Sequence, residues 1–154
     1  MPGKKILVPF NFTEYDEKAL HYVLRNYAGN KWAYVTLFHV YTPLPEIKGF
    51  SDTTLSRLSS TVAAMSGEIR EKEAELKKTV KDLVQSGFEE EQVDYIFRKR
   101  NKSIGLEVVE IMLERDYDTV VLTSRPAKMK HAFTRNVHDK LLTTLKDKEI
   151  CIIT

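Results

Sequence analysis

The stretch that decides the fold runs from Asp118 to Leu142 and reads DTVVLTSRPAKMKHAFTRNVHDKLL. Its first part is a short β-branched run between turn residues, which predicts a buried strand. Asn136, followed by apolar residues at helical spacing, predicts the start of a helix. Open α/β sheets bind ligands where a loop leaves the carboxyl end of a strand and enters a helix. The stretch therefore predicts an α/β fold and the place of its ligand site.

The loop between this strand and this helix is rich in cations. Its basic side chains are Arg125, Lys128, Lys130, His131 and Arg135. Together with the free N–H groups at the start of the helix, they could hold an anion such as phosphate. Phosphate loops normally contain glycine, because the backbone must approach the ligand closely. No glycine occurs between Leu122 and Leu145, so any anion would be held by side chains. The alternatives are a solvated loop or one that meets an acidic partner protein.

Length and composition indicate one globular domain, which we place at residues 1–154. The chain is 42% hydrophobic and 30% charged, and its net charge of +2 does not favour a nucleic-acid partner. No apolar run approaches the roughly 20 residues of a membrane span. No signal peptide precedes the first strand pattern, and the single cysteine, Cys151, forms no internal disulfide. We therefore expect a cytoplasmic protein without membrane contact.

Strand and helix patterns alternate along the whole chain. Apolar, β-branched runs predict strands at 5–10, 32–41, 93–97, 118–123 and 149–154. Apolar residues at helical spacing predict helices at 13–29, 52–85 and 103–116, and from Asn136 onward. This alternation predicts a parallel sheet with helices on both faces. Order in residues 42–61 stays open, and the basic run at 98–102 is expected to be a solvated strand end.

Five pieces of the chain, in order and over nearly its whole length, resemble the universal stress protein family. Its opening strand and helix are similar to Ile6-Leu-Val-Pro-Phe-Asn-Phe-Thr-Glu14 with Ala19-Leu20, and its second strand to Leu37-Phe-His-Val40 with Pro43. Its later elements are similar to 118–125, to the helix that begins Asn136-Val-His, and to Cys151-Ile-Ile. The resemblance implies an open five-stranded parallel sheet of order 3-2-1-4-5, Rossmann-like and adenine nucleotide alpha hydrolase-like.

The resemblance also implies where a nucleotide would bind. Members that bind ATP carry three glycines and a Ser or Thr after the fourth strand; the matching positions are Thr123, Pro126, Arg135 and Asn136, in a loop one residue shorter. The first-strand aspartate of binders is replaced by Asn11, whereas Val40 is retained. These departures predict that the usual ATP site is lost and that no cofactor is bound. The alternative is ATP with Mg²⁺ held by a side-chain-based phosphate loop. The candidate ligand-binding residues are Pro9, Phe10, Asn11, Val40, Thr123, Ser124, Arg125, Lys128, Arg135, Asn136 and Val137.

No catalytic or metal-binding pattern stands out. The histidines lack metal-ligand spacing, and Ser124 lacks the glycines of a hydrolase elbow, so we predict no metal and no enzyme. The resemblance implies a homodimer through the last strand, at Ile150, Cys151, Ile152 and Ile153. We interpret the chain as a dimeric binding or regulatory protein of a stress response, acting through protein contacts or a small ligand. An enzyme of the wider group of adenine-nucleotide hydrolases and ligases is the third alternative.

Overall fold

The sheet is built around β1 (Lys4–Pro9), whose residues from Ile6 to Pro9 are buried. The computed structural model describes residues 3–44, 52–123 and 147–153. Beside β1 lie β2 (Ala33–Tyr41) and β4 (Thr119–Thr123), with β3 (Val93–Lys99) and β5 (Glu149–Ile153) at the two edges. All pairings are parallel, and the strand order is β3-β2-β1-β4-β5. The predicted five-stranded sheet is confirmed.

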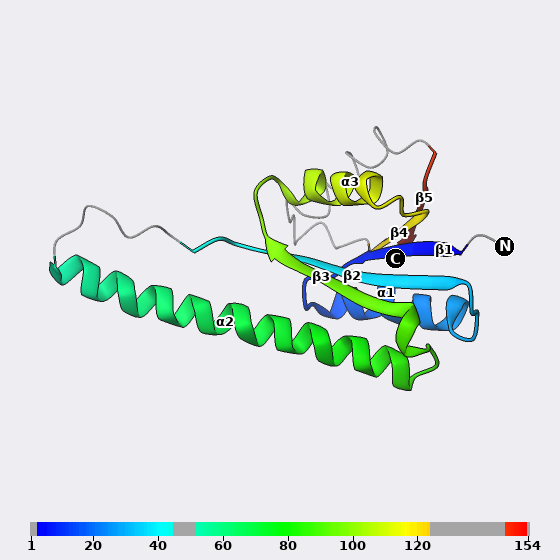
Figure 1. The fold of residues 1–154 in the computed structure, drawn as a ribbon, viewed down its shortest axis with the longest axis horizontal. Coiled ribbons are helices and arrows are strands. Elements are labelled where there is room, and N and C mark those ends of the chain that lie inside the picture. Colours follow the sequence, from blue (N-terminus) through cyan, green and yellow to red (C-terminus); the bar gives the residue numbers. More distant parts are fainter. Residues whose placement is uncertain (1–2, 45–51, 124–146, 154) are drawn as a thin grey trace.

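Helices cover both faces of this sheet (Figure 1). The helices α1 (Glu14–Tyr27) and α2 (Asp52–Gln85) lie on one face, α3 (Ile104–Glu114) lies on the other, and a short 3₁₀ turn, η1 (Glu90–Gln92), precedes β3. A capping box begins α1, because Thr13 and Asp16 satisfy each other's backbone N–H groups. Gly29 (φ +86°) and Gly87 (φ +142°) follow α1 and α2 in conformations that glycine tolerates best.

The alternation of side chains along the strands produces two hydrophobic cores. Ile6 and Val8 face α1 and α2, and they pack with Val23 and Leu76. Leu7 faces α3, where it packs in a second cluster with Phe38, Val108, Met112 and Val120. The central strands are therefore buried on both faces, which is why they read as continuous apolar runs in the sequence.

The helix α2 is long and is anchored mainly by its carboxyl-terminal half. It has 34 residues, which corresponds to about 50 Å at the usual helical rise. Leu76 and Leu83 are buried on the sheet, whereas Leu58 and Ile69, apolar residues of the same helix, are only half-buried. Figure 1 shows the amino-terminal half extending past the end of the sheet. The prediction of one helix from Asp52 to Gln85 is confirmed.

The basic run at 98–102 corrects one expectation. Strand β3 continues to Lys99, beyond the predicted end at Phe97, and Arg98 is not simply solvated. The carboxylate of Glu107 in α3 is buried and accepts hydrogen bonds from Arg98 (3.2 Å) and from the backbone N–H groups of Asn101 and Lys102 (3.0 Å each). A buried anion therefore organises the β3–α3 loop, because its charge must be paired. The helix predicted from Asn136 lies outside the described residues.

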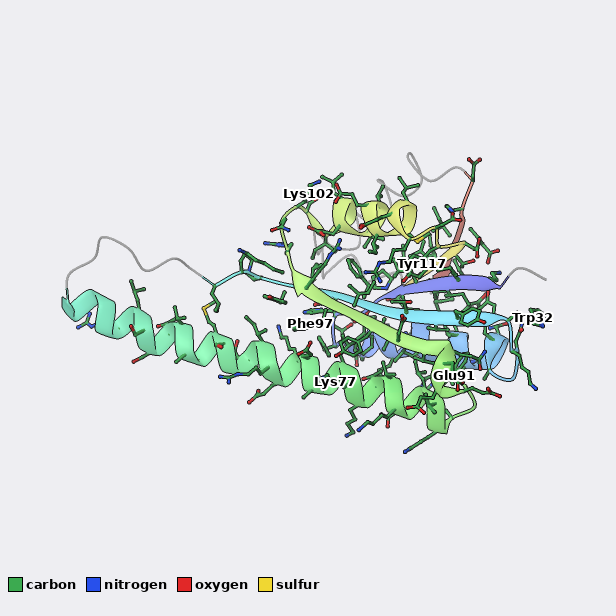
Figure 2. All side chains as sticks on the ribbon, viewed as in Figure 1. Trp32, Lys77, Glu91, Phe97, Lys102 and Tyr117 are labelled. Atoms are coloured by element: carbon green, nitrogen blue, oxygen red, sulfur yellow. The ribbon has the colours of Figure 1, made fainter. Side chains whose placement is uncertain are left out.

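The amino-terminal end of the sheet carries exposed aromatic side chains. Trp32, the only tryptophan of the chain, precedes β2 and is 52% exposed. Figure 2 shows it at the end of the sheet opposite Lys102. The ring of Tyr34 lies against the backbone of Gly3, where an added Cβ would come within 2.7 Å of that ring. None of the helices described is long and apolar enough to cross a membrane.

Candidate ligand-binding cleft

A small cleft lies at the carboxyl ends of β1 and β2. The chain order reverses beside β1, which has β2 on one side and β4 on the other, and ligands of open α/β sheets bind at such a switch point. The cleft is lined by Pro9, Phe10, Asn11, Phe38, His39, Val40, Ile104 and Val108. The structure thus brings together four of the predicted residues, Pro9, Phe10, Asn11 and Val40. The contribution of α3, through Ile104 and Val108, was not predicted; the apolar stripe of that helix was the available signal.

The cleft is narrow and has mainly apolar walls. Its volume is about 10 Å³, which is room for about one water molecule. Phe10, Phe38 and Val108 are buried, so the walls are packed into the protein. The described walls of the cleft therefore leave little room for a group larger than water.

The turn between β1 and α1 is held together by a buried carboxylate. Asp16 is 3% exposed and accepts hydrogen bonds from the backbone N–H groups of Asn11 (3.0 Å) and Thr13 (3.1 Å) and from the Thr13 hydroxyl (2.8 Å). Between them Phe12 adopts a left-handed conformation, with φ of 59°. The backbone N–H of Asn11 is therefore already used inside the protein, and a ligand would meet its side chain.

His39, one of the residues that line the cleft, is a neutral, buried imidazole. Its Nδ1 lies 2.9 Å from the carbonyl oxygen of Phe10, which can only accept, so Nδ1 carries the proton. The ring of Phe12 meets it edge-on at 4.9 Å, and the ring of Phe97 stacks on it at 5.5 Å. Figure 2 shows Phe97 on the side of the sheet that faces α2. Burial, together with the nearby charge of Lys72, lowers the pKa of His39 below its usual range, although the Phe10 carbonyl opposes this.

This histidine predicts a pH dependence of stability. The unfolded chain takes up a proton at His39 near the ordinary pKa of 6.5, whereas the folded protein resists it, so the free energy of unfolding falls as pH drops below that value. We expect His39→Asn, which keeps an N–H donor but cannot be protonated, to flatten the loss of stability between pH 7.5 and about pH 5.5. Urea unfolding across this range measures the slope. The exposed His21→Asn is the control, and an unchanged slope in His39→Asn would contradict the assignment.

The phosphate side of the predicted site is described only at its first residue. Thr123 ends β4 and is 7% exposed, and it does not line the cleft. The remaining predicted positions lie outside the described residues: Ser124, Arg125, Lys128, Arg135, Asn136 and Val137. Among the described side chains, no group of three or more His, Cys, Asp and Glu residues could hold a metal ion.

The doubly wound parallel sheet, with a cleft at its switch point, places the protein in the class of Rossmann-like α/β proteins. Within this class, the sequence profile of the Universal stress protein family matches residues 3–146, and the chain belongs to that family. Among the curated proteins, none matches the sequence.

Solved structures agree with this assignment at the level of the fold. The hypothetical protein MJ0577 is 21% identical, with a TM-score of 0.69 over 99% of this chain and 96% of that chain. The universal stress protein UspA from Lactobacillus plantarum is 11% identical, with a TM-score of 0.65 over 100% of this chain and 99% of that one. A universal stress protein from Archaeoglobus fulgidus in complex with dAMP is 13% identical, with a TM-score of 0.51 over 99% and 98%. A further universal stress protein, solved in complex with cAMP, is 11% identical, with a TM-score of 0.54 over 100% and 98%.

Proposed function

We propose that this chain is a dimeric, non-enzymatic binding or regulatory protein of a stress response that works without the usual ATP site of its family. It acts through protein contacts or through a small ligand other than ATP. The observation that carries the proposal is the size of the cleft, about 10 Å³ between packed apolar walls. Opening it for a nucleoside would disrupt contacts of Phe10, Phe38 and Val108, and this cost would be subtracted from the binding free energy.

The residues at the phosphate positions support the same proposal. Where the resemblance implies that ATP-binding members carry glycine, this chain has Thr123, Pro126 and Arg135. A Cβ hinders close approach of backbone to phosphate, and proline offers no N–H donor. Asn11 replaces the carboxylate that accepts hydrogen bonds from a ribose, and its backbone N–H is bonded to Asp16.

We predict that Mg-ATP leaves the thermal stability of the protein nearly unchanged. A ligand at 100 times its Kd adds about 2.7 kcal/mol to folding and raises Tm by several degrees. We expect a shift of less than about 1 °C at millimolar Mg-ATP, measured by differential scanning calorimetry. Protein purified without added nucleotide and then denatured should release no adenine nucleotide. A shift of several degrees, or stoichiometric release of adenine nucleotide, would contradict the proposal.

An adenine-nucleotide-binding role with an altered phosphate loop is the second candidate. Two observations favour it: Val40 is retained in the cleft, and universal stress proteins of the same fold are solved with cAMP and dAMP. In this case side-chain cations such as Arg125, Lys128 and Arg135 would hold the phosphates. The variant Arg125→Ala separates the candidates, because only in this second case would it remove an ATP-induced rise in Tm. ATP turnover lost in the same variant would instead favour an enzyme.

The edge strand β5 supports the proposed homodimer. The N–H of Glu149 bonds to the carbonyl of Asp118, the residue that directly precedes β4. The main-chain groups of Ile150 and Ile152 therefore point away from β4, to the edge at which no described strand pairs. Ile152 is also 41% exposed. An unpaired apolar strand edge is a template for another chain. We propose that two copies pair there through Ile150, Cys151, Ile152 and Ile153.

We predict that Ile152→Pro weakens this dimer at least tenfold. Proline removes the outward N–H of residue 152, whereas the hydrogen bonds of β5 to β4 use the neighbouring residues. Sedimentation equilibrium should therefore show a higher Kd for dimerisation, with unchanged far-ultraviolet circular dichroism. Ile152→Val is the matched control, because it keeps the N–H and most of the apolar surface. Equal dimer Kd values for the two variants would argue against pairing at β5.

A further inference from the structure

The opposite edge of the sheet, β3, has a row of main-chain groups directed outward. The N–H of Arg100 bonds to the carbonyl of Tyr41 in β2. Because main-chain direction alternates along a strand, the even-numbered residues of β3 point to β2 and the odd-numbered ones to the free edge. Val93, Tyr95, Phe97 and Lys99 therefore direct their N–H and C=O groups away from the sheet. In the described part of the chain, β3 pairs with β2 alone, and Figure 1 shows it crossing in front of the other strands.

The charges along this edge change sign at its centre. The charged residues before Ile96 are all acidic, and those after it are all basic. The acidic ones are Glu89, Glu90, Glu91 and Asp94, and the basic ones are Arg98, Lys99, Arg100 and Lys102. A second copy running antiparallel would place each acidic end beside a basic end. A parallel copy would place like charges side by side, which destabilises strand pairs. The charge pattern therefore favours one orientation.

The side chains fit one register of such an antiparallel pair, centred on Ile96. Asp94 then faces Arg98 of the second copy, Tyr95 faces Phe97, and Ile96 faces itself. Opposite charges and aromatic pairs directly across strands are stabilising. The directions of the main-chain groups agree with this register. The N–H and C=O groups of Tyr95 and Phe97 point outward, so these two residues form a hydrogen-bonded pair across the two copies. Those of Ile96 point to β2, so Ile96 and its counterpart form a non-hydrogen-bonded pair. The contact is thus self-complementary, as a two-fold interface must be.

Two further features of the β3 edge favour binding of a second copy. The side chain of Arg98 is held by Glu107 and lies over the ring of Phe38 at 5.5 Å, yet it remains 35% exposed. On the other face, a mainly apolar groove of about 530 Å³ follows the edge between α2 and β3, lined by Val80, Val84, Val93 and Tyr95 among others. Tyr95 and Phe97 of a second copy would lie on that same face.

We propose that β3 pairs antiparallel with β3 of a second copy about a two-fold axis at Ile96. This contact is separate from the proposed dimer at β5 and does not depend on the ligand proposal. A protomer with self-pairing edges at both β3 and β5 can join the proposed β5 dimers into one continuous sheet, so that association proceeds beyond the dimer at high concentration. The basic run at 98–102 then serves as the electrostatic complement of the acidic turn that precedes β3.

Sedimentation velocity over a range of concentrations tests the proposal. Wild type should form species larger than a dimer at high concentration, whereas Tyr95→Pro should stop at the dimer, because it removes an outward N–H that β2 does not use. Tyr95→Phe is the matched control. Asp94→Arg should have the same effect as Tyr95→Pro and, unlike it, should be sensitive to salt. Ile152→Pro alone should leave only the weaker dimer through β3, and Ile152→Pro combined with Tyr95→Pro should be monomeric, which separates the two interfaces. Identical sedimentation of wild type, Tyr95→Pro and Asp94→Arg would overturn the proposal.

A cysteine at the symmetry axis tests the register. In a Cys151→Ser background, Ile96→Cys should form a disulfide-linked dimer under mild oxidation, because opposing Cα atoms of a non-hydrogen-bonded pair lie about 4.5 Å apart. Lys99→Cys is the control, since it would face Val93 of the second copy and lie far from its own counterpart. Cross-linking through Lys99→Cys and not through Ile96→Cys would overturn the proposed pairing. Should Ile96→Cys be unstable, sedimentation of Asp94→Arg gives an independent answer.

Discussion

Replacing Glu107 with glutamine lowers the free energy of unfolding by about 2–4 kcal/mol, because a buried carboxylate that accepts from three donors is exchanged for a neutral, weaker acceptor. In the wild type the carboxylate is 2% exposed and accepts from Arg98 and from the N–H groups of Asn101 and Lys102. Urea unfolding measures the loss. The control is Glu110→Gln, which removes an exposed ion pair to Lys102 one turn along the same helix and should have a far smaller effect. Equal losses in the two variants would show that Glu107 is not the organising anion.

The same residue predicts behaviour in acid. Burial alone would raise the pKa of Glu107, but the N–H groups of Asn101 and Lys102 and the Arg98 guanidinium hold it below its ordinary value of 4.5. A carboxyl with a depressed folded pKa contributes stability above that ordinary value, and the contribution is lost as pH falls through the folded pKa. The stability difference between wild type and Glu107→Gln should therefore shrink below about pH 4.5. This window lies below the one assigned to His39.

Leu76→Ala should destabilise the fold by about 3 kcal/mol, the usual cost of truncating a fully buried leucine. Leu76 has no exposed surface and joins the core between α2 and the sheet. Ile69, two turns toward the amino-terminal end of the same helix, is half-buried and belongs to neither core cluster. Ile69→Ala is therefore the matched control, with an expected cost of less than about 1 kcal/mol. Thermal and urea unfolding of both variants measure the difference.

If both truncations cost the same, the amino-terminal half of α2 must be packed as tightly as the rest. If Leu76→Ala costs little, the core described between α2 and the sheet is not the principal anchor of that helix. Equilibrium unfolding can measure both free-energy changes, because a single domain of this size usually unfolds in one cooperative step.

Much of the fold follows from local signals in the sequence. The capping box at Thr13 and the glycines at 29 and 87 set helix ends through backbone chemistry that neighbouring residues decide. The buried runs of β1 and β4 are unambiguous because both faces of the sheet are covered. The order of the strands is different, since periodicity gives alternation and handedness but not which strand pairs with which. That order was an implication of the family resemblance.

The site was harder to predict because its properties arise between distant segments. Asn11 and Val40 were expected together because the family resemblance implies that both belong to the nucleotide site, and both line the cleft. The narrowness of the cleft depends on how Ile104 and Val108 of α3 pack over those strand ends, and spacing in the sequence carries no such distance. Glu107 appeared as one charge among apolar neighbours, and only the tertiary structure shows that it neutralises the loop beside it.

The exposed indole of Trp32 determines which spectroscopic readout suits this protein. It is the only tryptophan, it precedes β2, and the candidate cleft lies at the opposite ends of the strands. Its emission should already be red-shifted in the native state, so denaturation will change the wavelength little, and ligand quenching at the cleft will be weak. A reporter indole introduced at Phe97, which stacks on His39, would instead place the fluorophore where unfolding and occupancy both alter its surroundings.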